Sequence, residues 1–167
     1  MTKRIRQYAG LLAAIAAYYL IHEGAHLLYA LLIGTFKQVN IGGLGMQIDV
    51  YAEQMTGVQM GVFCIVGSIA TLITGWCLSA AANRICKCSS KVFKACMYYV
   101  TIALLLIDPL YLSVLCSFFG GGDMNGIALL IPELAARVLY SALLVINGCL
   151  IWRRVYPVFK AAFDKQA

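Results

Sequence analysis

Charged residues are scarce in this chain of 167 residues, and their scarcity excludes an ordinary soluble domain. Only 12% of the residues are charged, whereas 62% are hydrophobic and the mean hydropathy is +0.84. A soluble domain typically has nearly half apolar and about a quarter charged residues. Because no stretch is long enough or polar enough to form a second domain, we expect one membrane-embedded domain over residues 1–167.

Histidine is rare, and the cysteines do not form a recognisable framework. The chain has two histidines and seven cysteines, and the cysteines are scattered over the apolar stretches. An odd and scattered set does not indicate disulfides, so we expect free thiols. Cys86 and Cys88 are closer together than the usual paired cysteines of a zinc site. A metal or redox role for these two is the lesser alternative.

Long apolar runs are what the sequence has in excess. Four runs reach the roughly 20 residues that cross a bilayer core, and they cover residues 8–33, 57–82, 95–119 and 131–152. We therefore predict an all-α polytopic membrane protein with four transmembrane helices. The basic and aromatic tail, residues 153–167, is predicted to form an amphipathic anchor at the membrane interface.

The first apolar run also has features of a signal peptide. Lys3, Arg4 and Arg6 resemble a basic n-region, and Ala14-Ile15-Ala16 resembles a cleavage site. The run is too long for an h-region, because it stays apolar as far as Ile33. We therefore expect it to be retained as the first transmembrane helix.

Residues 35–55 have a different pattern and predict a small membrane-associated β-hairpin between the first two helices. Apolar and polar residues alternate around the glycine-rich segment 42–45, as in paired strands. An ordinary surface hairpin would explain the pattern. Alternatively, the hairpin dips toward a functional site and offers its edge to an extended peptide, in which case Ile48 and Val50 are the candidate contacts.

The first helix carries the motif His22-Glu23-Gly24-Ala25-His26. Histidines four residues apart lie on one face of a helix, where two neutral imidazoles can bind one zinc ion. Glu23 is then placed to act as general base toward a water molecule, as in the zinc-protease signature. Ionisable residues within a membrane are costly and usually functional. The alternative is a pair of buried structural histidines beside a structural glutamate.

A catalytic zinc site needs a third protein ligand, and no third histidine exists. Among the carboxylates, Asp108 and Asp123 are the candidates that remain. Three glycines precede Asp123, and irregular backbone at membrane depth is tolerated only inside protein or beside water. This favours Asp123 as the third ligand, with Asp108 as the alternative.

Together these motifs resemble the site-2 protease family of intramembrane zinc metalloproteases, over about residues 8–128. In that family an aspartate of the third helix, usually followed by glycine, completes the zinc site. Asp123 matches it, although Met124 stands in place of that glycine. Asp108-Pro109 resembles the Asn and Pro that normally precede the aspartate, and Asn125 follows it here.

The resemblance implies a minimal, single-domain zinc metalloendopeptidase that binds Zn²⁺ through His22, His26 and Asp123. It would hydrolyse a peptide bond of a membrane-embedded or membrane-associated peptide, or of a single-span membrane protein, with Glu23 as catalytic base. The expected substrate contacts are Asn125, Asp108, Ile48 and Val50. The alternatives are an inactive relative that acts as a peptide-binding, immunity or assembly factor, and a small metal or proton transporter.

The net charge of +6 indicates membrane orientation rather than nucleic-acid binding. Eleven of the thirteen basic residues lie at the N-terminus, in the 84–94 loop and in the tail, which four spans place on one side. Lysine and arginine mark the cytoplasmic side, so we expect a protein of the cell membrane with both termini cytoplasmic. The active site would then lie in the extracytoplasmic half, whereas the family's best-known members hold zinc nearer the cytoplasm.

Overall fold

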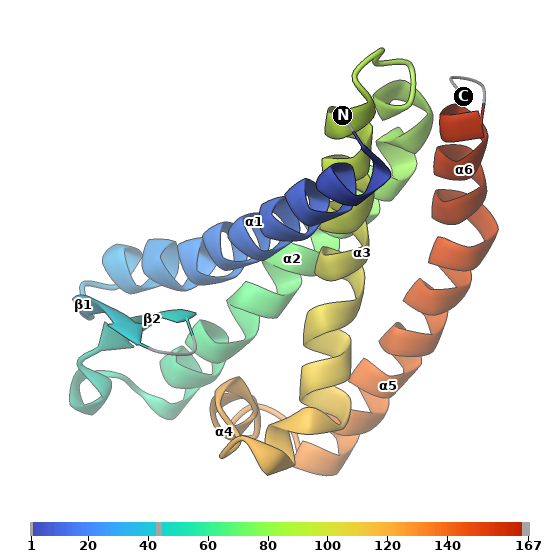
Figure 1. Ribbon diagram of the computed structural model, residues 1–167. Coiled ribbons are helices and arrows are strands. Elements are labelled where there is room, and N and C mark those ends of the chain that lie inside the picture. Colours follow the sequence, from blue (N-terminus) through green and yellow to red (C-terminus); the bar gives the residue numbers. More distant parts are fainter. Residues whose placement is uncertain (1, 43–44, 165–167) are drawn as a thin grey trace.

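The computed structural model describes residues 2–42 and 45–164, and it consists mainly of helices (Figure 1). Four helical stretches are long and apolar enough to cross a membrane. They are α1 (Lys3–Leu32), α2 (Gly57–Ile85), α3 (Lys91–Ser113) and the continuous stretch Glu133–Asp164. At about 1.5 Å per residue, even the shortest exceeds the ~30 Å of a hydrocarbon core. The prediction of four apolar helices is confirmed.

Helices α1, α2 and α3 each begin after a side chain that accepts a hydrogen bond from one of their first free N–H groups. Thr56 and Gln59 form a reciprocal capping box at the start of α2. Ser90 accepts a hydrogen bond of 3.2 Å from the backbone N–H of Phe93, so α3 begins at Lys91, earlier than the apolar run alone predicts.

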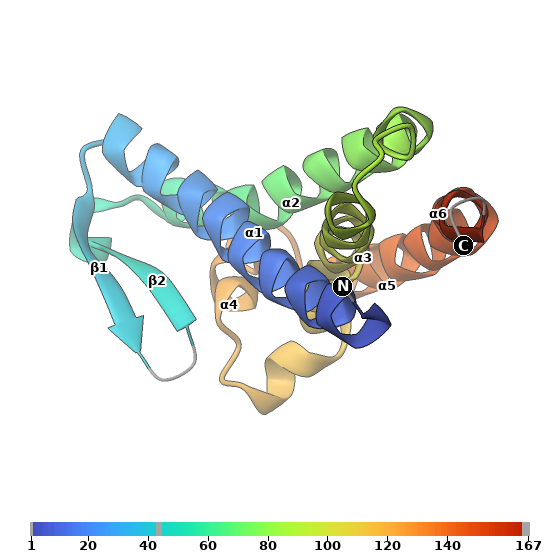
Figure 2. The ribbon, with the colours of Figure 1, turned by 45° about the horizontal axis from the view of Figure 1, so that its top comes forward.

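The predicted hairpin is present between α1 and α2 (Figure 2). Strands β1 (Phe36–Gly42) and β2 (Gly45–Val50) pair antiparallel, with Val39 opposite Ile48. A short 3₁₀ helix, η1 (Ala52–Gln54), leads into α2. The predicted turn residues Gly43 and Leu44 lie outside the described residues.

The third helix ends at Ser113, six residues before the predicted boundary at Phe119. The chain continues as a 3₁₀ turn, η2 (Leu115–Phe118), which is apolar and therefore indistinguishable from helix by composition. Arg137 stabilises this irregular segment, because its guanidinium donates to the Ser113 carbonyl (3.4 Å) and to the Ser117 hydroxyl (2.6 Å).

Pro109 lies inside α3 and cannot donate the usual hydrogen bond to the carbonyl of Leu105. The side chain of Asn147, which is fully buried, donates to that carbonyl at 2.7 Å. Its oxygen in turn accepts a hydrogen bond from the indole of Trp76 at 2.9 Å. One polar side chain thereby compensates for the proline and connects three helices.

In the described residues, the predicted tail continues the last helix. Helix α5 (Glu133–Leu150) continues through a π-helical turn, η3 (Ile151–Val155), into α6 (Tyr156–Asp164). Val155 and Phe159 are buried and pack with Ala82 of α2. Val155, Phe159 and Phe163 are spaced four residues apart, so one apolar face of this stretch packs against the bundle. Residues 165–167 of the predicted tail lie outside the described residues.

Helix α1 packs on both α2 and α3, and α3 packs on α5. The short helix α4 (Asp123–Ile127) packs on α2. The hairpin and α4 lie at one end of the molecule, and both termini lie toward the other (Figure 1). This arrangement brings the middle of α1, the hairpin and α4 to one place.

Candidate metal centre

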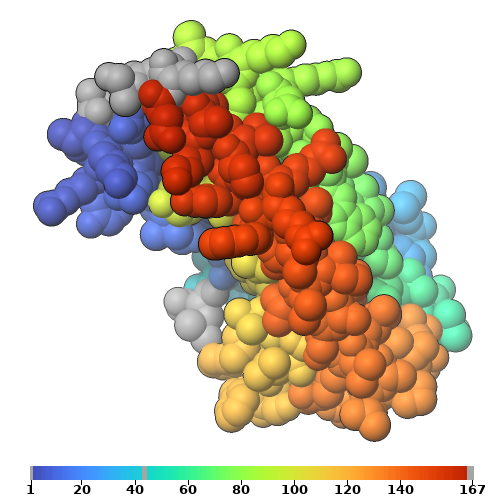
Figure 3. All heavy atoms as spheres, turned by 90° about the vertical axis from the view of Figure 1, so that its right-hand side faces the viewer, coloured from blue at the N-terminus to red at the C-terminus, as the bar shows by residue number. Residues whose placement is uncertain are grey.

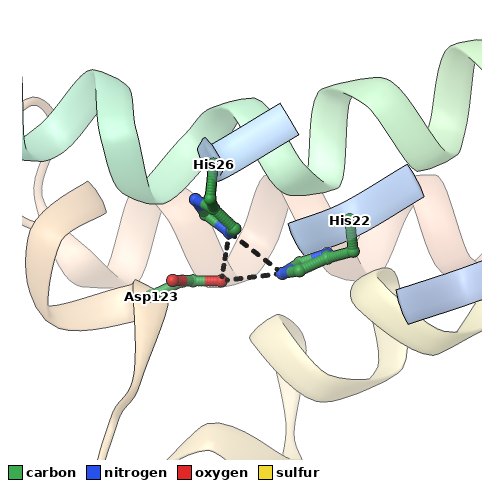
Figure 4. Close-up of side chains that lie close together, drawn as sticks. All are labelled: His22, His26 and Asp123. Carbon is green, nitrogen blue, oxygen red and sulfur yellow. Dashed lines mark hydrogen bonds and ion pairs between the residues drawn. The ribbon is translucent and has the colours of Figure 1, made fainter. Parts of the chain in front are cut away.

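Three side chains from two distant parts of the chain converge between α1 and α4 (Figure 4). The Nε2 atoms of His22 and His26 are 3.1 Å apart. An oxygen of Asp123 lies 3.2 Å from Nε2 of His22 and 3.6 Å from Nε2 of His26. The three predicted ligands are therefore together, and they form a cluster that could hold a metal ion.

The shape of this cluster fits a small tetrahedral metal site. With metal–ligand bonds of about 2.0–2.1 Å, neighbouring ligands of a tetrahedron are about 3.3 Å apart. The three distances between the ligand atoms lie between 3.1 and 3.6 Å. These spacings match one face of a tetrahedron, and a tetrahedral ion held there would have a fourth position for another ligand.

The two imidazoles are held in place by aromatic rings on either side. His22 stacks on Tyr18 with ring centroids 5.2 Å apart, and His26 packs against Phe63 of α2 at 4.7 Å. Both histidines are buried, at 7% and 3% exposure. A side chain that cannot rotate away loses little further freedom when it binds a ligand, so this packing favours metal binding.

Gly67 of α2 lies directly against the ligand atoms. A methyl group at this position would come within 2.5 Å of Nε2 of His26 and within 2.8 Å of the His22 ring. Small residues in membrane helices often serve helix packing. At Gly67 the absence of a side chain has a second consequence, since it leaves room for the imidazole edges.

Three consecutive glycines turn the chain so that Asp123 faces the histidines. Gly120, Gly121 and Gly122 all have positive φ angles, between +47° and +88°, which residues with a side chain rarely adopt. Gly126 then packs so closely on α2 that an added methyl group would meet the sulfur of Cys64 at 2.2 Å. The glycine break therefore performs the role that the sequence predicted for it.

The two histidines favour the ionised form of the Asp123 carboxyl group. Burial acts to raise its pKa, but the interactions with His22 and His26 outweigh burial and lower the pKa to about 2. An ionised carboxylate beside two imidazole nitrogens is a suitable ligand set for a divalent cation.

Asp108 lies behind the ligands, on the far side of the His22 ring. Its carboxylate is 3.3 Å from Nδ1 of His22 and accepts a hydrogen bond of 2.6 Å from the hydroxyl of Tyr18. Thr71 of α2 donates to the same carboxylate. A carboxylate on the second nitrogen of a ligating histidine fixes its tautomer and orientation. Asp108 also lines the cavity that contains His22, Glu23 and Asp123, so its predicted contact with substrate stays a prediction.

Glu23 points toward the hairpin. Its carboxylate accepts a hydrogen bond of 3.2 Å from the backbone N–H of Ile48 in β2. Both residues line a cavity of about 840 Å³ that also contains His22, His26 and Asp123. The cavity therefore connects the candidate ligands with β2 of the hairpin.

Val50 and Asn125 are the remaining predicted substrate contacts. Neither of them lines this cavity. The side chain of Asn125 donates to the Gly120 carbonyl at 3.1 Å and packs over the glycine turn. For Asn125 this contact indicates a role in supporting the turn before Asp123.

Sequence reasoning missed Tyr18, Thr71 and the steric role of Gly67. Tyr18 is one helical turn before His22, so its proximity could have been predicted from helical spacing. Thr71 and Gly67 come from another helix, and no local signal in the sequence pairs them with the motif. Comparison with family models, with curated proteins and with solved structures finds no match to this chain.

Proposed function

We propose that this protein is an intramembrane zinc metalloprotease similar to the site-2 proteases. The observation that carries the proposal is the cluster of His22, His26 and Asp123 within four apolar helices, beside Glu23. Two imidazoles, one carboxylate and an open fourth position are typical of catalytic zinc sites. Zinc in such a site supplies Lewis acidity, which activates water and polarises a carbonyl group.

Glu23 is the proposed general base. Its carboxylate lies on the same cavity as the ligands and is held by the N–H of Ile48. In this role it accepts a proton from the attacking water and delivers the proton to the leaving amine. Asp108 is proposed to act through His22, by holding the ring so that Nε2 faces the cavity.

The proposed substrate is a peptide or single-span membrane protein in an extended conformation. A helix hides its peptide bonds, so the cleaved segment must unwind before it reaches Glu23. The Ile48 N–H points toward Glu23 and therefore away from β1. The edge of β2 that does not pair with β1 therefore faces the cavity, and an unwound segment could pair with this edge.

Peptide cleavage by the purified full chain tests this function. The chain in detergent micelles is incubated with a library of hydrophobic peptides, and products are identified by mass spectrometry. Wild type and Glu53→Gln, which changes an exposed carboxylate of η1, are expected to cleave the same peptides. Glu23→Gln is expected to cleave none while it retains its metal. Equal cleavage by Glu23→Gln would contradict the proposal, and peptide retention without cleavage by wild type would indicate the inactive peptide-binding alternative.

A further inference from the structure

A second cavity lies at the end of the molecule that carries both termini, away from the metal centre. It has a volume of about 520 Å³ and is formed by the first turns of α1, the first turns of α3, and α6. Figure 3 shows the N-terminal segment beside the end of α6 on this face. None of the residues that line it belongs to the candidate metal centre, and we call it the basic end cavity.

The walls of the basic end cavity are strongly cationic. Among the described residues, one carboxylate, that of Asp164, and four basic side chains line it; the basic residues are Lys3, Arg6, Lys91 and Lys160. They come from three separate helices, so only the fold brings them together. Such a surplus of positive charge in one concave site favours an anionic ligand, and arginine and lysine are the usual partners of phosphate.

The floor of the cavity is apolar and aromatic. Phe159 and Ala95 are buried beneath it, and the rings of Tyr98 and Phe159 are 5.3 Å apart. Tyrosines with an apolar body and a polar hydroxyl are typical of the membrane–water interface. The ligand that matches both features has an anionic group beside an apolar part.

A buried lysine holds α6, which forms one wall of the basic end cavity, against the bundle. Lys94 of α3 is fully buried, and its Nζ donates to the Ala162 carbonyl at 3.3 Å and lies 5.6 Å from the centre of the Phe163 ring. These contacts hold α6 beside α3. The cavity is therefore a part of the packed fold rather than a gap between mobile segments.

We propose that the basic end cavity binds the headgroup of an anionic phospholipid. The phosphate would lie among Lys3, Arg6 and Lys160, and the glycerol and first acyl carbons would lie on the aromatic floor. Basic pockets between transmembrane helices bind such headgroups, and anionic lipids are abundant in the cytoplasmic leaflet. The proposal does not depend on proteolytic function.

Native mass spectrometry of the delipidated full chain tests this site. The protein in detergent is mixed with equal amounts of phosphatidylglycerol and phosphatidylcholine, and the bound lipids are counted. Wild type is expected to retain phosphatidylglycerol preferentially. In Lys3→Gln/Arg6→Gln/Lys160→Gln the preference should fall about fivefold for each charge removed, whereas Lys3→Arg/Lys160→Arg should keep it.

The matched control removes equal charge from the same end without touching the cavity lining. Arg4→Gln/Arg84→Gln/Arg153→Gln is expected to keep the wild-type preference, since none of these side chains lines the cavity. An equal loss in this control would overturn the proposal, because general surface charge would then explain the binding. Equal retention of both lipids by wild type would also overturn the proposal.

Displacement of the lipid by millimolar glycerol 3-phosphate would indicate a site for a free phosphate compound instead, and would overturn the lipid assignment.

Discussion

At the scale of single residues, His22, His26 and Asp123 form a cluster that could hold a metal ion, and Asp108 lies beside the other nitrogen of His22. Helical spacing places His22 and His26 on one face, and the glycines before Asp123 mark a break that can return a carboxylate to the bundle. The alternative ligand, Asp108, could not be assigned from the sequence. Its partner His22 is 86 residues away, and only the packing of α1 on α3 decides which nitrogen it faces.

Gly67 offers a steric test of the metal centre. A methyl group there would overlap Nε2 of His26 and the His22 ring, both of which lie at the proposed ligand positions. Gly67→Ala is therefore expected to lose most bound metal. Gly24→Ala, inside the motif itself, adds a methyl group with nothing within 4 Å and should keep wild-type metal content. Metal analysis of the purified variants checks this, and equal metal content in the two variants would contradict the placement of the ligands.

Asp108 and Asp123 should differ in what they contribute. Asp123→Ala removes a ligand and is expected to abolish metal binding. Asp108→Asn changes the group that orients His22, so metal affinity should fall by about 10–100-fold while binding remains measurable. Competition with a chelator of known affinity measures both. If Asp108→Asn strips the metal and Asp123→Ala retains it, the two carboxylates have been assigned to the wrong roles.

At the scale of elements, hydropathy identified the helices but not where they end. The apolar run of the third helix extends to Phe119, yet α3 ends at Ser113, because Arg137 stabilises a non-helical segment from another part of the chain. The tail was predicted to be an amphipathic anchor, and contacts of Val155 and Phe159 with Ala82 place one of its faces against α2. Composition indicates which segments are apolar, whereas contacts with residues distant in sequence decide where each helix ends.

The hairpin provides a prediction at the same scale. Ile48 of β2 donates its N–H to Glu23 and not to its partner Val39 in β1. Residues 39 and 48 are therefore a pair without mutual hydrogen bonds, and the N–H of Val39 faces the outer edge of β1. Ile48→Pro removes the Glu23 contact and is expected to abolish cleavage without loss of metal. Val39→Pro removes an equivalent N–H from the outer edge and should cleave normally. Normal turnover by Ile48→Pro would show that the hairpin is only a surface feature.

At the scale of the whole molecule, the two ends of the bundle differ in charge. The N-terminus, the loop between α2 and α3, and α6 lie at one end, and the hairpin and α4 lie at the other (Figure 1). The first end carries most of the basic residues. We therefore predict that the basic end is cytoplasmic and that the metal centre lies in the extracytoplasmic half.

Labelling of intact cells with a membrane-impermeant thiol reagent tests this orientation. Single cysteines are placed at position 3, 42 or 88 in a background in which the other native cysteines are replaced. Position 42, at the end of β1, is expected to react, and positions 3 and 88 are expected to be protected. The reverse pattern would contradict the orientation.

The most direct test of the central claim is the metal content of the purified chain. Elemental analysis is expected to find about one zinc ion per chain in wild type, and almost none in the variant His22→Ala/His26→Ala. Glu23→Gln should retain the zinc, because it leaves all three ligands in place. Wild-type protein without bound zinc, or unchanged zinc in the double histidine variant, would contradict the account.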